Sequence, residues 1–234
     1  MYVIILCLQS VKPVDCLDHS QSFEDLMEMV EDQRVQQLLH QAGFWYFMQI
    51  KYIRFDRSLI TALSDRWRPE TCTFHFSVGE MTITLQDVSI LLGLPIEGAV
   101  LNYGGNVDAE EVCQRLLGEI PPPEAVVNRR ELKVKWLNDL IIGREISVDS
   151  SIEEIEQFTR AVILLLIASR LFANHSKGRV SVKWLYLLED FATIFDYSWG
   201  SAVLCALYKE LDNVALRKTN GLAGCLTLLQ VCLF

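Results

Sequence analysis

Two Cys-x-x-His pairs come nearest to a chemical site in this chain: Cys16 with His19, and Cys72 with His75. Together they would supply the ligands of a Cys₂His₂ zinc site. The residues around His75 alternate like a strand, however, and side chains three positions apart in a strand point to opposite faces. Because Cys72 and His75 would then not reach one ion, we expect no bound metal. We interpret His75 as a strand histidine that bonds within the fold.

Motifs for covalent catalysis or phosphate binding do not occur in the sequence. There is no G-x-S-x-G, no catalytic cysteine signature, no H-E-x-x-H and no G-x-x-x-x-G-K-[ST]. Carboxylates that could bind Mg²⁺ have structural explanations, since Glu80 suits a turn, Asp87 a helix N-terminus, and the Glu189-Asp190 pair a helix flank. We therefore expect a non-enzymatic protein with no cofactor and no small-molecule substrate. The alternative, a residual enzyme of unknown class, would need a pocket with convergent carboxylates or a perturbed lysine.

The composition is that of a folded, acidic protein. With 234 residues, of which 51% are hydrophobic, the chain can bury a sizeable core, and its net charge of −9 argues against a chain-wide phosphate-binding surface. A local basic stretch lies between residues 51 and 70, where Lys51, Arg54 and Arg57 are candidate nucleic-acid contacts. The alternative is a solvated helix face. The 7 cysteines are scattered, which indicates a reducing compartment without a disulfide framework. The apolar runs are short for a membrane span.

Residues 73–85 predict a β-hairpin. Apolar and polar residues alternate from Phe74 onward, and a second alternating run begins at Met81. Gly79 and Glu80 lie between the runs, and a glycine at the first central position suits a two-residue type II′ turn. This register predicts one wholly apolar face, with His75 on the other. Its opposed pairs are Val78 with Met81, Phe76 with Ile83, and Phe74 with Leu85.

The hairpin leads into a helix whose two ends are marked in the sequence. Thr84 suits the N-cap and Asp87 the third helical position, which is an acidic variant of the capping box. Gly93 suits the left-handed position after the helix, and Pro95 prevents continuation. The segment from 73 to 95 therefore predicts a self-contained unit of strand, turn, strand and helix.

We predict a mainly α protein, a multi-helix domain with one small β-hairpin at about residues 72–84. Residues 1–34 are expected to form an acidic, partly loose lead-in, and residues 35–234 a single helical domain that is truncated at its C-terminal end. The expected helices cover about residues 33–42, 56–67, 84–93, 108–117, 130–140, 151–173, 184–194, 197–212 and 221–234.

Polar residues concentrate around the predicted hairpin and form a candidate interaction surface. Its members are Arg66, Arg68, Glu70, His75 and Glu80. The alternative is that they form an internal hydrogen-bond and ion-pair network that holds the hairpin on the helices. Residues 128–135 form a thin basic cluster, which we interpret as an exposed helix flank.

Several motifs occur together: Arg66-Trp67-Arg68-Pro69-Glu70-Thr71, Gly79-Glu80-Met81-Thr82-Ile83-Thr84-Leu85-Gln86-Asp87-Val88, Leu91-Leu92-Gly93-Leu94-Pro95 and Tyr197-Ser198-Trp199-Gly200-Ser201-Ala202. In this combination the chain resembles the plant mobile domain family, found in the MAINTENANCE OF MERISTEMS group of plant proteins, over about residues 35–234. It departs from the family at Cys72, where members often carry histidine, and at Ser77-Val78, where they usually carry proline. The family's terminal aromatic-rich helix is not found after Gln230.

The resemblance implies a nuclear interaction domain of transposon-related origin, linked to transposable-element silencing, genome integrity and meristem maintenance. It implies nuclear protein partners, and a transposon origin leaves nucleic acid as an alternative partner of residues 51–70. The family is also called aminotransferase-like, which would imply a lysine that carries pyridoxal phosphate. We expect the lysines to lie at exposed helix or turn positions and to bind no such cofactor: Lys51, Lys133, Lys135, Lys177, Lys183, Lys209 and Lys218.

Overall fold

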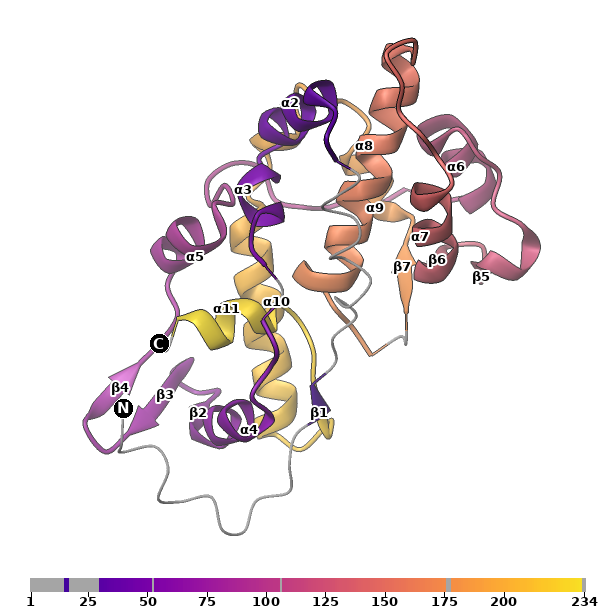
Figure 1. Ribbon diagram of the computed structural model, residues 1–234. Helices are drawn as coiled ribbons and strands as arrows, with labels where there is room; N and C mark the ends of the chain where they lie inside the picture. Colours follow the sequence, from indigo (N-terminus) through magenta and orange to yellow (C-terminus); the bar gives the residue numbers. More distant parts are fainter. Residues whose placement is uncertain (1–14, 17–29, 52, 106, 176–177, 233–234) are drawn as a thin grey trace.

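The computed structural model of the chain describes residues 15–16, 30–51, 53–105, 107–175 and 178–232 (Figure 1). The predicted mainly α class is confirmed. The α-helices are α2 (Gln33–Gln41), α3 (Trp45–Met48), α4 (Arg57–Arg66), α5 (Leu85–Leu92), α6 (Ala109–Leu117), α7 (Val134–Ile142), α8 (Ile152–Leu166), α9 (Lys183–Leu187), α10 (Trp199–Ala215) and α11 (Leu226–Val231). Shorter helical turns are η3 (Pro123–Ala125), η4 (Ile167–Leu171) and η5 (Ile194–Asp196).

Short strands form small sheets at the edges of the helical body. The strands are β1 (Asp15–Cys16), β2 (Trp67–Arg68), β3 (Thr73–Phe76), β4 (Gly79–Met81), β5 (Val126–Val127), β6 (Glu131–Lys133), β7 (Arg179–Ser181) and β8 (Gly221–Leu222). The sheets β2–β3–β4 and β5–β6–β7 are antiparallel, and β1 pairs with β8 in parallel. Figure 1 shows the two antiparallel sheets at opposite ends of the molecule.

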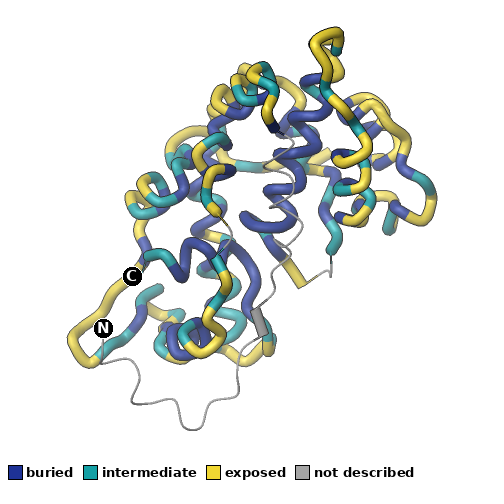
Figure 2. Tube along the Cα trace, viewed as in Figure 1, coloured by how far each residue is buried: buried dark blue, intermediate teal, exposed yellow. Residues whose placement is uncertain are grey.

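Two helices organise the core. α8 packs against α2, α6, α7 and α9, while α10 packs against α4, α5, β2 and β8. From Phe158 onward, every residue of α8 is buried (Figure 2), and from Ala161 onward every one is also apolar, as expected of a helix surrounded by other elements. Trp199, the first residue of α10, is fully buried and contacts the rings of Phe44 and Trp184, so it joins the packing around α10 to α2, α3 and α9.

The Tyr-Ser-Trp-Gly-Ser segment at the start of α10 holds the loop that follows α5. The backbone N–H of Gly200 donates to the carbonyl of Pro95 at 2.7 Å, and the Ser198 hydroxyl donates to the carbonyl of Ala99 at 3.1 Å. A Cβ on Gly200 would lie 2.9 Å from the Ile96 side chain, so the close approach requires glycine. These contacts join this motif to the segment that begins with the Gly-Leu-Pro motif.

The predicted helix caps are confirmed. Thr84 and Asp87 form the capping box of α5, and Ser151 forms a second capping box at the start of α8. Gly93 ends α5 in the left-handed conformation with φ 65°. The backbone N–H groups of Ser58 and Leu59 donate to the N-cap Asp56 of α4 at 2.9 and 3.1 Å. Local signals therefore place these ends correctly, because each is satisfied within its own turn.

Replacing Thr84 by alanine is expected to lower the free energy of unfolding at neutral pH by about 1 kcal/mol. The Thr84 hydroxyl donates to the Asp87 carboxylate at 2.7 Å, which holds the pKa of Asp87 below its ordinary value of 3.8. A lowered folded-state pKa stabilises the fold above the unfolded-state pKa, and this part is lost as the pH falls through the folded-state value. Urea titrations from pH 7 to pH 2 should show the variant and the native protein converging. Gln86→Ala, on the exposed face of the same helix, should change little, and a pH-independent Thr84→Ala effect would contradict the assignment.

Several predicted boundaries are wrong. The helix expected from residue 130 begins only at Val134, because residues 131–133 pair with β7 as strand β6. The helix expected over 184–194 ends at Leu187, and the long helix from Ser151 changes to a π-helical turn after Leu166. At residues 131–133, pairing with a distant strand overrides the local periodicity.

Part of the predicted lead-in lies outside the described residues, namely 1–14 and 17–29. Asp32 caps α2, so the helical body includes residues 33 and 34, which were assigned to the lead-in. The side chains of Cys16 and His19 also lie outside the described part, so the first half of the hypothetical zinc site is not placed. No described helix is both long and apolar enough to cross a membrane.

Candidate functional site

Trp67 anchors the β2–β3–β4 sheet to the core. The chain leaves α4 at this residue, and the following Arg68-Pro69 step favours an extended backbone. The Trp67 side chain is fully buried, its indole N–H donates to Asp212 of α10 at 2.7 Å, and its ring packs against Phe74 and Tyr208. The root of the sheet is therefore fixed, and its far end extends from the helical body (Figure 1).

The predicted hairpin exists, but its register is wrong. Phe74 pairs with Met81 and Phe76 with Gly79, so the turn is at Ser77-Val78 and not at Gly79-Glu80. Gly79 follows the turn with φ 135°, which favours glycine. The strand ends at Met81 because Ile83 enters the core, while the Thr82 hydroxyl bonds to the carbonyl of Cys72 at 2.7 Å.

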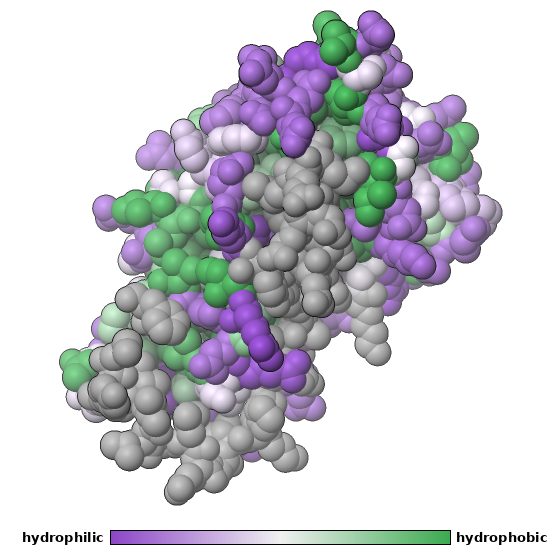
Figure 3. Space-filling view, viewed as in Figure 1, coloured by the Kyte–Doolittle hydropathy of each residue, from purple (hydrophilic) through white to green (hydrophobic). Residues whose placement is uncertain are grey.

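The corrected register exposes apolar residues that the prediction buried. Val78 lies in the turn and is 82% exposed, and Met81 is 50% exposed. Leu85, at the start of α5, is also largely exposed. Apolar residues also lie at the surface over α3 and α5, where Figure 3 shows a green area. Gly79 could have indicated the correct turn, because it directly follows Ser77-Val78 and glycine is common at the fourth position of type I turns.

The hairpin register brings His75 and Glu80 together. They are opposite each other on β3 and β4, and His75 Nε2 lies 3.4 Å from Glu80 Oε1. This contact is not a hydrogen bond, and the Nε2 atom is shielded from solvent without a hydrogen-bond partner in the described part of the chain. The other Glu80 oxygen accepts a bond from the Thr73 hydroxyl at 3.0 Å.

Arg66 and Arg68 bind the end of α4. Arg66 donates to the carbonyl of Ala62 at 2.9 Å, and Arg68 donates to the carbonyls of Asp65 and Trp67, each at 3.0 Å. Cations suit this position because helix C-termini leave carbonyls unsatisfied and carry partial negative charge. Burial raises the pKa of the Asp65 carboxyl despite the two neighbouring arginines.

The five candidate residues thus do not form one cluster. His75 and Glu80 contact each other, Arg66 and Arg68 have local backbone partners, and Glu70 is exposed on the turn after β2. The arginine bonds stay at the end of α4, and the contacts of Glu80 stay within the hairpin. The exposed apolar side chains beside it, Val78 and Met81, make the same end of the molecule a surface that could bind another protein. We call Val78, Glu80 and Met81 the hairpin tip.

The basic residues of the 51–57 stretch are exposed, and Gln230 bonds the backbone at residues 54 and 56. Lys51, Arg54 and Arg57 are all exposed. The buried side chain of Gln230 accepts from the N–H of Asp56 at 3.1 Å and donates to the carbonyl of Arg54 at 3.2 Å. The Asp56 carboxylate lies between the two arginines in sequence and lowers the local positive charge.

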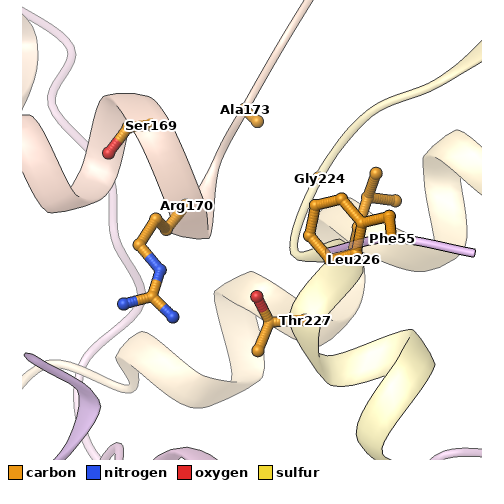
Figure 4. A pocket seen from close by; sticks show the side chains of 7 residues that line it. All are labelled: Phe55, Ser169, Arg170, Ala173, Gly224, Leu226 and Thr227. Atoms are coloured by element: carbon orange, nitrogen blue, oxygen red, sulfur yellow. The ribbon is translucent and has the colours of Figure 1, made fainter. Parts of the chain in front are cut away.

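A small pocket lies where η4 meets α11 (Figure 4). The space that a water-sized sphere can fill is about 10 Å³, enough for about one water molecule and far less than a small-molecule ligand needs. Its polar groups already have protein partners, because Arg170 donates to the carbonyl of Ile50 at 2.8 Å and Ser169 to that of Leu165 at 2.6 Å. Its described lining includes no carboxylate and no lysine: Phe55, Ser169, Arg170, Ala173, Gly224, Leu226 and Thr227.

The thiols in the described part of the chain are unbridged at Cys72, Cys113, Cys205, Cys225 and Cys232. Burial raises the pKa of Cys113 to about 12 and that of Cys225 to about 11. Thiols with such values stay protonated at neutral pH and are poor nucleophiles and metal ligands. Within the described residues, no three histidine, cysteine or acidic side chains converge as a metal site would require.

Comparison of the sequence with known proteins shows its family. The family model for the plant mobile domain matches residues 43–234, so this chain belongs to the plant mobile domain family. It is 42% identical over 195 residues to Protein MAINTENANCE OF MERISTEMS of Arabidopsis thaliana, covering 82% of this chain and 40% of that protein. It is 43% identical over 196 residues to Protein MAIN-LIKE 1 of the same plant, covering 82% of this chain and 38% of that protein.

A third relative carries a different name. The chain is 38% identical over 200 residues to Serine/threonine-protein phosphatase 7 long form homolog of Arabidopsis thaliana, covering 86% of this chain and 15% of that protein. The chain thus spans two fifths or less of the length of these relatives. No solved structure matches the chain significantly. Nothing in these names supports the label aminotransferase-like.

Proposed function

We propose that this chain is a non-enzymatic interaction domain that works in the plant nucleus and binds a protein partner through the hairpin tip. The observation that carries the proposal is the exposure of Val78 and Met81 beside the charged Glu80 on a sheet that Trp67 fixes to the core. Apolar side chains surrounded by polar ones on a rigid support are typical of protein-binding surfaces. The partner chemistry that fits is a protein surface with an apolar patch, which would cover Val78 and Met81.

The biological setting of the proposal comes from the relatives. One of them is named for the maintenance of meristems, and we extend that role to this chain as part of the proposal. With the resemblance described above, the setting is silencing of transposable elements and protection of genome integrity. The pocket beside η4 supports a non-enzymatic role, because Arg170 and Ser169 are already bonded to backbone carbonyls.

Charge substitution at the hairpin tip is expected to remove the partner without unfolding the domain. Val78→Lys with Met81→Lys places two charges where a partner would bury apolar groups, and this should weaken capture at least tenfold, since buried unpaired charges are costly. The measurement is quantitative affinity purification of the tagged full chain from plant nuclei. Val148→Lys is the matched control, because Val148 is 92% exposed in the loop between α7 and α8. Equal capture by all three proteins would contradict the proposal.

A second candidate function is nucleic-acid binding through Lys51, Arg54 and Arg57. It is favoured by the exposure of all three residues and by the bonds from Gln230 to the backbone of Arg54 and Asp56. Phosphate contacts of this kind weaken steeply as salt rises. Arg54→Glu with Arg57→Glu should then remove binding to nucleic acid, which is one arm of the titrations described below.

A further inference from the structure

The β5–β6–β7 sheet gathers basic residues from two distant segments of an acidic chain. On neighbouring strands, Lys133 lies directly opposite Arg179. The N–H of Val182 donates to the carbonyl of Arg130 at 3.0 Å, which brings the start of α9 beside Arg130. We define the basic sheet surface as Arg129, Arg130, Lys133, Lys135, Arg179 and Lys183. The sequence alone suggested an exposed helix flank for residues 128–135, and this is wrong for 131–133, which form strand β6.

The basic sheet surface carries an excess of positive charge. Glu131 pairs with Arg179 at 3.2 Å, and both side chains are partly exposed. Glu131 already balances the charge of Arg179, so the excess comes from the exposed Arg129, Arg130, Lys133, Lys135 and Lys183. Arg130 lies in the turn that precedes β6, and Lys133 is the last residue of the strand. Three residues of extended chain span about 10 Å, a distance that a continuous phosphate backbone can cross.

The surface is rigid and pre-formed. Leu132 and Val180, on the inner face of the sheet, are buried in the core, so the opposite face is held outward. The turn between β5 and β6 holds Asn128 and Arg129 with φ 53° and 57°. Such turns favour Asn-Gly, and arginine at the second position is strained. The strain is maintained because the carbonyl of Arg129 accepts a bond from Ala109 at 3.1 Å.

The character of this surface favours a nucleic-acid backbone over a protein partner. Among the described residues, the large exposed hydrophobic side chains all lie outside 126–135 and 179–183. Protein interfaces have an apolar centre, whereas nucleic-acid interfaces are polar and positively charged. Trp136 and Trp184 pack against the core, which leaves no aromatic platform at these positions for unstacked bases. We propose that the basic sheet surface binds the phosphate backbone of double-stranded DNA without reading its sequence. Glu110 and Glu111, at the start of α6, border it.

The test is a fluorescence-anisotropy titration of the full chain with a random-sequence DNA duplex of about 20 base pairs, at salt from 50 to 200 mM. Lys133→Glu with Lys135→Glu should weaken binding at least tenfold at low salt and reduce the salt slope by about 2, one for each lost phosphate contact. Lys209→Glu with Lys218→Glu changes the net charge equally on exposed positions elsewhere and should have a much smaller effect. Equal losses in the two double variants would overturn the proposal, because only net charge would then matter.

Arg129→Gly separates binding from folding. Glycine relieves the strained turn, so the variant should unfold at a higher temperature while binding DNA several-fold more weakly. A gain in stability with unchanged DNA binding would contradict a role for the turn. Loss of binding in Arg54→Glu with Arg57→Glu, but not in Lys133→Glu with Lys135→Glu, would assign DNA binding to the 51–57 stretch and overturn the inference. Tighter binding of polyglutamate than of the duplex would point to an acidic protein and overturn it as well.

Discussion

Trp199→Ala is expected to lower the free energy of unfolding by about 3–5 kcal/mol. The side chain is fully buried at the start of α10 and its indole N–H donates to the carbonyl of Ile194 at 2.8 Å. Its ring contacts Phe44 and Trp184, so the substitution leaves a cavity where three parts of the core meet. The cavity cannot collapse easily, because the start of α10 is also bonded to the loop after α5.

The measurement is equilibrium urea unfolding followed by circular dichroism. Trp199→Phe keeps most of the buried ring and should lose clearly less stability than Trp199→Ala. Tyr46→Ala is a control for loss of an aromatic side chain that is largely exposed. A loss below about 1 kcal/mol for Trp199→Ala would contradict a central packing role for this residue, because removing a fully buried tryptophan side chain lowers the free energy of unfolding by about 3–5 kcal/mol.

Arg160→Met is expected to destabilise the protein by about 3–5 kcal/mol, because it breaks a buried charged network by removing one partner. Arg160 lies on α8 and donates to the carbonyls of Leu188 and Glu189, each at 2.9 Å, and to the Glu156 carboxylate at 2.7 Å. Its guanidinium also lies 4.9 Å from the centre of the Phe191 ring. Removal leaves the carbonyls and the carboxylate without this donor and releases the segment after α9.

Arg115→Met is the matched control for Arg160→Met. Arg115 pairs with the Glu189 carboxylate, whereas Arg160 bonds the backbone carbonyl of the same residue. The Arg115 and Glu189 side chains are both more than two fifths exposed, and such surface pairs contribute about 0–1 kcal/mol. Urea unfolding should therefore separate the two variants, and hydrogen exchange should show faster exchange around residues 188–191 in Arg160→Met alone. Similar stabilities for the two variants would contradict the importance of the buried network.

Local features could be predicted from the sequence. The capping boxes at Thr84 and Ser151 and the left-handed Gly93 depend on residues within a turn or two of each other. The mainly α class follows from the same periodic signals. These features do not depend on which distant segment packs against them.

Features that depend on distant contacts could not be predicted. The predicted hairpin register was wrong for two reasons. Ile83 is buried in the core, and Phe74 on β3 also pairs with Trp67 on a third strand, β2. Residues 131–133 form a strand because β7 pairs with them from almost fifty positions away, and the bond from Trp67 to Asp212 joins residues 145 positions apart. No window of sequence contains both members of these pairs.

The candidate site shows the same division. The sequence identified His75 and Glu80 as polar residues near one hairpin, and the structure pairs them. The prediction assigned Val78 and Met81 to a buried face because it placed the turn at Gly79-Glu80. In the observed register the turn is at Ser77-Val78, and both residues are exposed. Ser77-Val78, the position at which the sequence departs from the resembled family's usual proline, forms the turn itself. Proline is common in β-turns, so the departure falls at a turn position.

The most direct measurement is affinity purification of the tagged chain from plant nuclei, with and without nuclease, in the native form and as Val78→Lys with Met81→Lys. We expect protein partners that survive nuclease with the native chain and are lost with the variant. Partners that survive nuclease equally well with both forms would contradict the assignment of protein binding to the hairpin tip. Partners that all disappear with nuclease would contradict the protein-interaction function itself and leave contact with nucleic acid as the primary role.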